Sequence, residues 1–282
     1  MKRSFRHYGV ILPFLLLASG CTGVALHATS SLVPDLTRTF FEECDLKLAQ
    51  ESLPAQLKLM EGLLKGAPTN TAFLTALSMG FTGYAMLFVE AEDPHRASRL
   101  YLRARTYGLR AIGIKGPASE GLRARLKTVD KEALAPLFWA TMSWYGWINL
   151  NLDDPEALAD MGTAQACLDR VMEIDPDYFF GAPYLLAGSM LAARPQMLGG
   201  DAEKAEEYFS RAMAVSNGTF FLAPYYYAKY YAVRAQDRAL FIDLLSGVTQ
   251  GQPDHLKEVC LINAAIQKRA EDLITKADDL FF

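Results

Sequence analysis

The sequence predicts an all-α protein, a right-handed solenoid of helical hairpins with extra helices flanking the repeated units. Apolar residues recur at helical spacing over nearly the whole chain beyond residue 34, and no segment shows the sustained two-residue alternation of a strand. Proline and glycine divide this pattern into segments joined by short connections. With 51% hydrophobic and 21% charged residues among 282, the chain can bury a large core and lacks the composition of a disordered protein.

Residues 1–20 have the features of an export signal. Lys2, Arg3 and Arg6 form a basic start, and the apolar stretch that follows, residues 10–17, is far shorter than the roughly 20 residues of a spanning helix. The sequence LASGC, which ends at Cys21, resembles a bacterial lipobox. We therefore expect Cys21 to be lipidated and to become the mature N-terminus. Ordinary secretory cleavage nearby is the alternative.

A lipid on Cys21 would hold the protein at a bilayer surface while its body stays in water. Residues 21–34 are expected to form the lipidated N-terminus and a tether, and residues 35–282 a single all-helical domain. The residue after the lipidated cysteine influences sorting, and an aspartate there would retain such a lipoprotein in the inner membrane. Thr22 at this position favours the periplasmic face of the outer membrane.

The signal contains basic but no acidic residues, so the mature chain is more acidic than the full chain with its net charge of −4. Nucleic acid is therefore not an expected partner.

The cysteines and histidines do not indicate a metal site. Cys44, Cys167 and Cys260 lie more than 90 residues apart without a Cys-x-x-Cys pair. At most one disulfide can form among them, and the sequence favours three buried, apolar side chains. The histidines of the mature chain lack paired spacing: His27, His95 and His255. We expect neither a metal nor a cofactor.

The predicted helices begin at capping residues and end near glycine or proline. Asp93, Asp154 and Asp175 each precede a proline, so each carboxylate can cap a helix whose first position the proline suits. The helices are expected over residues 35–51, 54–65, 71–91, 94–112, 120–127, 131–152, 159–174, 179–193, 202–215, 220–235, 238–248 and 254–277.

Two hairpins share one spacing of aromatic, small and apolar residues. The first has Phe81, Tyr84, Ala85 and Phe88, then Ala97, Tyr101 and Ala104; the second has Tyr184, Ala187, Gly188 and Leu191, then Ala205, Phe209 and Ala212. A partial third match, Ala164 with Leu168, runs into Asp175. This spacing is typical of tetratricopeptide-like repeats, in which small residues lie where two helices cross and the first helix of each pair lines a concave face.

Whole segments also resemble one family, the T component of tripartite ATP-independent periplasmic (TRAP) transporters, also called TatT. The segments are LPAQLKLMEGLL at 53–64, YLRARTYGLR at 101–110, LFWATMSW at 137–144, ARPQMLGGD at 193–201 and NAAI at 263–266. The likeness extends over residues 34–282. It implies a tetratricopeptide-like lipoprotein without catalytic activity that works beside a periplasmic solute-binding protein. It further implies an internal pore and assembly into oligomers such as trimers.

The free faces of the first helices provide candidates for the pore wall. That wall would be mostly apolar with a few hydroxyls, which suits a hydrophobic or amphipathic ligand because burial of its surface favours binding. The alternative is that the same residues only fill a core. The candidates are Met79, Thr82, Met86, Val89, Ser143, Trp144, Trp147, Leu185 and Ser189.

Two further segments are candidates for a partner or oligomer surface. A run of tyrosines that includes Tyr226, Tyr227 and Tyr230 covers more than half of one helix, so some hydroxyls must reach water or a polar partner. Leu198 lies in a Gly-rich segment that we interpret as a tight loop closed by an Asp201 cap. Acidic residues follow this loop, so it is a poor anion cradle, but it is available for docking.

No catalytic motif occurs, including Gly-x-Ser-x-Gly, the P-loop and Gly-x-Gly-x-x-Gly. Two non-enzymatic interpretations stay open. A transport accessory would dock a solute-binding protein and contain a cavity that binds or channels a hydrophobic ligand. A scaffold lipoprotein for envelope assembly, similar to pilotins, would bind a peptide in an open groove and have no tunnel.

Overall fold

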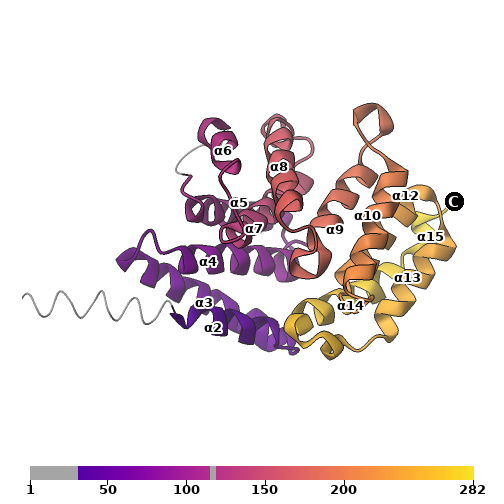
Figure 1. Ribbon diagram of the computed structural model, residues 1–282. Coiled ribbons are helices and arrows are strands. Elements are labelled where there is room, and N and C mark those ends of the chain that lie inside the picture. The colour runs from indigo at the N-terminus through magenta and orange to yellow at the C-terminus, as the bar shows by residue number, and fades with distance from the viewer. Residues whose placement is uncertain (1–30, 115–118) are drawn as a thin grey trace, which may run out of the picture.

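The computed structural model describes residues 31–114 and 119–282, and all regular secondary structure in these two ranges is helical. The predicted all-α class is therefore confirmed for the described part of the chain. The predicted signal peptide, Cys21 and most of the predicted tether lie outside the described residues. Helices follow one another in an arc, from α2 and α3 through α7 and α9 to α13 and α14 (Figure 1).

The first half of the arc consists of α2 (Val33–Phe41), α3 (Leu46–Gly66), α4 (Thr71–Tyr84), the π-helical segment η1 (Ala85–Val89), α5 (Pro94–Ala111), α6 (Ser119–Leu126), α7 (Leu134–Leu150) and α8 (Pro155–Ile174). The second half consists of α9 (Tyr178–Ala193), the 3-10 turn η2 (Gln196–Leu198), α10 (Ala202–Val215), α11 (Leu222–Tyr226), the π-helical segment η3 (Tyr227–Ala232), α12 (Val233–Ala235), α13 (Arg238–Gln250), the 3-10 segment η4 (Pro253–Val259), α14 (Cys260–Ile274) and α15 (Ala277–Leu280).

Consecutive helices pack as hairpins, with α4 on α5, α7 on α8 and α9 on α10. The small residues expected at helix crossings lie in close contacts. A Cβ atom on Gly188 would lie 3.3 Å from the carbonyl oxygen of Ala205, and one on Gly146 would lie 2.7 Å from the ring of Tyr101. Larger side chains at these two positions would force the helices or the ring apart.

Three of the four aspartates predicted to cap helices do so. Asp93 accepts the backbone N–H of Arg96, Asp154 that of Glu156, and Asp201 that of Lys204. Asp175 differs, because it follows the end of α8 and accepts the N–H of Asp177 in the turn before α9.

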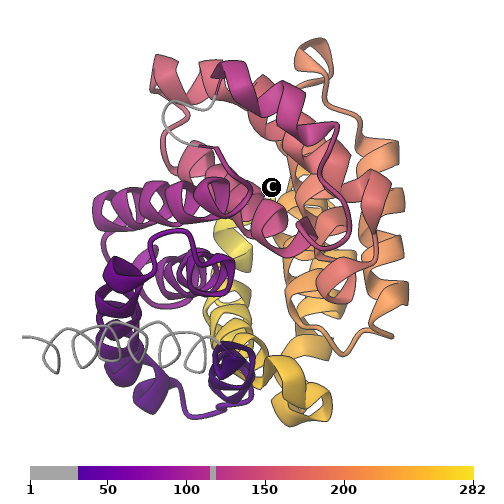
Figure 2. The same cartoon turned by 60° about the vertical axis from the view of Figure 1, so that its left-hand side comes forward.

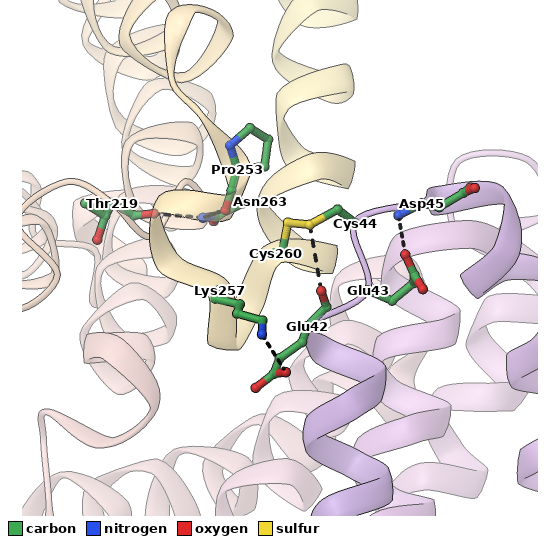
Figure 3. Close-up of a disulfide and its surroundings, with 9 residues drawn as sticks. All are labelled: Glu42, Glu43, Cys44, Asp45, Thr219, Pro253, Lys257, Cys260 and Asn263. Atoms are coloured by element: carbon green, nitrogen blue, oxygen red, sulfur yellow. Dashed lines mark hydrogen bonds and ion pairs between the residues drawn. A yellow bond between two sulfur atoms is a disulfide. The ribbon is translucent and has the colours of Figure 1, made fainter.

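The chain closes on itself through its two ends. Helix α14 packs against α2 and α3, and Cys44, in the break between those two helices, forms a disulfide with Cys260 at the start of α14 (Figure 3). Their Cα atoms are 5.2 Å apart. The prediction of three buried apolar cysteines is therefore wrong for this pair, because tertiary packing brings their backbones together. It is confirmed for Cys167, which is free and buried.

Several predicted helix boundaries differ from the structure, and three of the differences change how the chain is divided into helices. The predicted helix 35–51 ends at Phe41, and α3 begins after a break that Asp45 closes by accepting the N–H groups of Lys47 and Leu48. Helix α3 then continues through Pro54, where we expected a break, because its buried face packs on the core on both sides of the proline. The predicted helix 254–277 begins instead as the 3-10 segment η4.

The start of α9 is a left-handed turn that the sequence does not predict. Phe179, Phe180 and Gly181 have φ values of 47°, 60° and 80°. The non-glycine residues among them adopt this conformation at a cost of about 1–2 kcal/mol each. Aromatic contacts offset that cost, since the Phe179 ring lies 5.0 Å from Trp139 and 5.9 Å from Phe220 between ring centroids.

One apolar segment of the described chain, Thr71–Val89, is long enough to cross a membrane. It comprises α4 and η1, and 72% of its most apolar window is buried inside the protein. This burial is typical of the core helix of a globular domain.

Candidate functional site: a methionine-lined cavity

A partly enclosed cavity of about 170 Å³ lies where η1, α5, α7, α9 and η3 meet. In Figure 2 the second half of the arc, coloured pink to yellow, curves beside the first half. Four methionines contribute to the apolar wall, which gives the cavity a flexible lining. The lining residues are Thr82, Met86, Glu90, Tyr101, Met142, Tyr145, Gly146, Ile148, Asn149, Leu152, Met161, Leu186, Ser189, Met190, Ala193, Arg194, Tyr226 and Tyr230.

Both π-helical segments contribute to this wall. In η1 the N–H of Glu90 donates to the carbonyl of Ala85, 2.9 Å away, instead of to the carbonyl of Met86. The Met86 carbonyl thus accepts a hydrogen bond from Arg269 of α14. The hydroxyl of Tyr226 lies 3.9 Å from the Met86 sulfur. π-Helical turns are rare in proteins, but those that occur are often found at functional sites. Two such turns in the wall of one cavity therefore mark it as the candidate site.

On the side of the π segments, one pair of polar groups in the wall is hydrogen-bonded. The hydroxyl of Tyr101 donates to the carboxylate of Glu90. The rings of Tyr226 and Tyr230 meet edge to face, with centroids 5.2 Å apart. Burial raises the pKa of both hydroxyls above the ordinary tyrosine value, so they are neutral at physiological pH. Glu90 is therefore the negative charge on this side.

On the side of α7 and α9, polar groups of the wall lack partners. The hydroxyls of Tyr145 and Ser189 are buried and make no hydrogen bond within the described residues. Burial raises the pKa of Tyr145 far above its ordinary value, and the positive charge of Arg194 opposes that rise. The tyrosine is neutral at physiological pH and is a hydrogen-bond donor.

The residues predicted for the pore wall are divided between this cavity and other places. Thr82, Met86 and Ser189 line the cavity. Met79 lines a second, apolar groove of about 400 Å³ between α2, α3 and α4. The others are not in the cavity wall and, by burial class, belong to the core: Val89, Ser143, Trp144, Trp147 and Leu185.

Trp144 has a clear structural role on the opposite face of α7. Its indole N–H donates to the carboxylate of Asp160, 2.9 Å away in α8. Arg105 forms an ion pair of 2.8 Å with the same carboxylate and lies 4.7 Å from the indole ring. This cluster ties α5, α7 and α8 together.

The residues predicted for a partner surface are also divided. Tyr226 and Tyr230 line the cavity, whereas Tyr227 is buried and its hydroxyl donates to Glu206 at 3.3 Å. Leu198 ends the turn η2, and its side chain lies outside the described part of the structure. The loop around it has the expected form, with Gly199 at φ 83° and an Asp201 cap on α10.

Helix periodicity did not predict several lining residues: Glu90, Tyr101, Met142, Tyr145, Met161, Met190 and Arg194. Regular α-helical spacing allows either Val89 or Glu90 to follow Met86 on the face of Thr82, and the prediction chose Val89. A π turn contains more residues than an α turn, so Glu90 follows Met86 on the cavity side instead. Tyr101 and Met161 come from second helices of hairpins, which the prediction did not consider. Met142, Tyr145 and Met190 lie on the first helices α7 and α9, at positions that the prediction did not choose, and Arg194 directly follows α9.

A third hollow, of about 530 Å³, separates α3 from α5 and is basic. Lys58, Lys65, Arg103 and Arg110 line it around the largely buried Glu61. Burial raises the pKa of Glu61, but hydrogen bonds from Lys58, Tyr107 and Arg103 outweigh burial and hold it below its ordinary value.

Within the described ranges, no group of three or more histidine, cysteine, aspartate or glutamate residues could hold a metal ion.

This chain is similar to one protein family and to an individual bacterial protein. Residues 42–281 match the family model described as the TRAP transporter T-component. An uncharacterized protein of Treponema pallidum (strain Nichols) is 25% identical over 273 residues, which are 88% of this chain and 84% of that protein. The match extends over the helices that form the cavity wall.

Proposed function

This chain belongs to the T-component family of TRAP transporters, and we propose that, as an accessory component of such a transporter, it binds an apolar or amphipathic ligand in its methionine-lined cavity. The observation that carries this proposal is the largely apolar wall between two π-helical segments. Burial of a ligand's apolar surface there would contribute about 25 cal/mol per Å² before the costs of association. A sugar would find few polar partners.

The proposal extends to the place and assembly of the protein. The lipobox-like sequence supports a lipid anchor on Cys21 at the periplasmic face of the outer membrane. The packing of α4 on α5 and α9 on α10, with alanines or glycines at the crossings, supports a solenoid of tetratricopeptide-like hairpins. Oligomers such as trimers and a pore that channels the ligand are part of the same proposal, which assigns no catalytic activity.

Docking of the periplasmic solute-binding protein of a TRAP system is the proposed partner function. Family membership supports it, since an accessory component must meet another part of the system. We expect the full-length protein to co-purify with the solute-binding protein of the same transporter after chemical crosslinking in cells. Crosslinking in which that protein is never recovered would contradict the docking proposal.

Substitution of Met86 by tryptophan tests ligand binding. The indole would project into the cavity and compete with the ligand, so we expect the affinity for the neutral fluorophore N-phenyl-1-naphthylamine to fall about tenfold or more, equivalent to about 1.4 kcal/mol. Fluorescence titration of the full-length protein measures this affinity, and circular dichroism shows whether the variant is folded.

The matched control for this variant is Met197→Trp. Met197 is 89% exposed on the turn after α9 and does not line the cavity, so this change should leave probe affinity as in the native protein. Met190→Phe, a smaller change in the same wall, tests the site again if the tryptophan variant does not fold. Native affinity in both cavity variants would exclude this cavity as the ligand site.

A further inference from the structure

The α7–α9 side of the cavity contains two hydroxyls that the fold leaves without partners. Tyr145 comes from α7 and Ser189 from α9, and both line the same cavity. Their oxygen atoms are shielded from solvent, and no described residue bonds to them. Buried polar groups are nearly always hydrogen-bonded, so two buried hydroxyls without hydrogen bonds in the wall of one cavity call for an explanation.

Arg194 adds a positive charge to the same wall. Among the described residues its guanidinium has neither an ion-pair partner nor a hydrogen bond, although other arginines of the wall region, such as Arg269, are bonded to the protein. Its charge acts on the Tyr145 hydroxyl, so the two groups are within electrostatic range of each other. Three donor groups without a partner among the described residues, those of Tyr145, Ser189 and Arg194, therefore line one side of the cavity.

The loop that follows α9 fixes the position of Arg194. The N–H of Gly200 donates to the carbonyl of Pro195 at 3.0 Å, and the N–H of Asp201 donates to Leu191 at 3.3 Å. A Cβ atom on Gly200 would lie 1.9 Å from the Arg194 carbonyl oxygen, so only glycine fits there. The segment ARPQMLGGD thus holds an arginine at the cavity in a loop tied down on both sides.

We propose that Tyr145, Ser189 and Arg194 form a subsite for the oxyanion head of an amphiphile whose apolar tail lies against the methionines of the cavity. This inference rests on the proposed function and names the class of ligand. Two hydroxyls and a guanidinium donate hydrogen bonds to an anionic oxygen, and such charge-assisted bonds are the strong ones. Binding of the anionic head would give the hydroxyls of Tyr145 and Ser189 the hydrogen-bond partner that the described part of the protein does not provide.

The other side of the cavity favours the same orientation. Glu90, its negative charge, already accepts a hydrogen bond from Tyr101. The Tyr226 hydroxyl contacts the Met86 sulfur at 3.9 Å. A cationic head could pair only with the Glu90 carboxylate, which already has the Tyr101 hydroxyl as one partner, whereas an anionic head would meet three donor groups at Tyr145, Ser189 and Arg194. The tail would then extend from α7 and α9 towards η1 and η3.

The test is a calorimetric titration of the full-length protein with three eight-carbon probes: octanoate, octanol and octyltrimethylammonium. We expect octanoate to bind about tenfold more tightly than octanol, because a hydrogen bond to a charged group that the neutral alcohol lacks changes the affinity by about this factor. The ammonium compound should bind most weakly. Tyr145→Phe and Ser189→Ala should each weaken octanoate binding several-fold and change octanol binding less. Arg194→Met should make octanoate and octanol equal.

Matched controls separate a binding role from a structural one. Arg123→Met, which changes an exposed arginine on α6 outside the cavity, should leave all three affinities unchanged. Without ligand, Tyr145→Phe and Ser189→Ala should keep or raise the Tm, since each removes an unsatisfied buried hydroxyl. A fall in Tm together with unchanged octanoate binding would assign these hydroxyls to the fold and overturn the subsite.

The remaining outcomes distinguish this inference from the proposed function. Equal binding of octanoate and octanol that none of the three variants changes would overturn the subsite and leave the apolar cavity intact. Tightest binding of the ammonium compound would place the head at Glu90 and overturn the inference. Failure of every probe to bind the native protein would overturn both the subsite and ligand binding in this cavity.

Discussion

Replacement of Cys44 by serine is expected to cost the protein up to about 5 kcal/mol of its free energy of unfolding. The disulfide joins residues 216 positions apart, and a crosslink that closes so long a loop removes much of the entropy of the unfolded chain. The bond also fixes the break between α2 and α3 to the start of α14 (Figure 3). Urea unfolding of the oxidised protein, with and without a reductant, measures the effect.

Two controls make the disulfide prediction specific. Cys260→Ser should cost as much as Cys44→Ser, and the double variant should cost no more than either single one, because all three lack the same bond. A reductant should destabilise the native protein and leave the variants unchanged. Hydrogen exchange in α2 should also become faster in the variants. Equal stability of native and reduced protein would show that the apolar contacts of α14 hold the two ends of the chain together without the disulfide.

Replacement of Asn263 by alanine is the second large effect that we expect. This fully buried side chain of α14 accepts the N–H of Phe221 at 2.9 Å. It also donates to the carbonyls of Thr219 and Pro253 at 2.8 and 3.2 Å, two residues that Figure 3 shows beside it. Alanine would remove all three of these hydrogen bonds to the backbone. Since an unsatisfied buried group costs about 1–3 kcal/mol, a loss of about 3 kcal/mol or more is expected in urea unfolding.

Gln267, one turn further along α14, provides the matched control. It donates to the carbonyls of Val248, Thr249 and Gly251, but it is only partly buried, so water can replace it. Gln267→Ala should therefore cost about 1 kcal/mol. Asn263→Asp should be at least as damaging as alanine, because its carboxyl group keeps one acceptor and loses both donors. Similar losses for Asn263→Ala and Gln267→Ala would contradict a special role for Asn263.

Much of the fold could be predicted because it depends on neighbours in the chain. Asp93, Asp154 and Asp201 cap helices through N–H groups two or three residues away. Ala97 and Ala205, at the predicted crossings, are fully buried as the hairpin spacing requires. These features depend on local hydrogen bonding and helical periodicity, which a sequence displays directly.

The candidate site was less predictable for two physical reasons. A π turn at η1 shifts the cavity face from Val89 to Glu90, and the sequence gives no periodic signal for such a turn. Tyr145 and Arg194 reach the cavity because helices distant in the chain cross there. The sequence around an aromatic or basic residue on a helix does not show which distant helix its side chain will contact.

The sequence by itself determined the helical class, the caps, the small residues of the hairpins and the family resemblance. Only the tertiary structure decided that Cys44 pairs with Cys260, that Tyr226 and Tyr230 line a cavity, and that no described residue bonds to the hydroxyls of Tyr145 and Ser189. The former depend on contacts within a few residues along the chain. The latter depend on packing between segments up to 216 residues apart, where many pairings fit the same pattern and only the assembled core selects one.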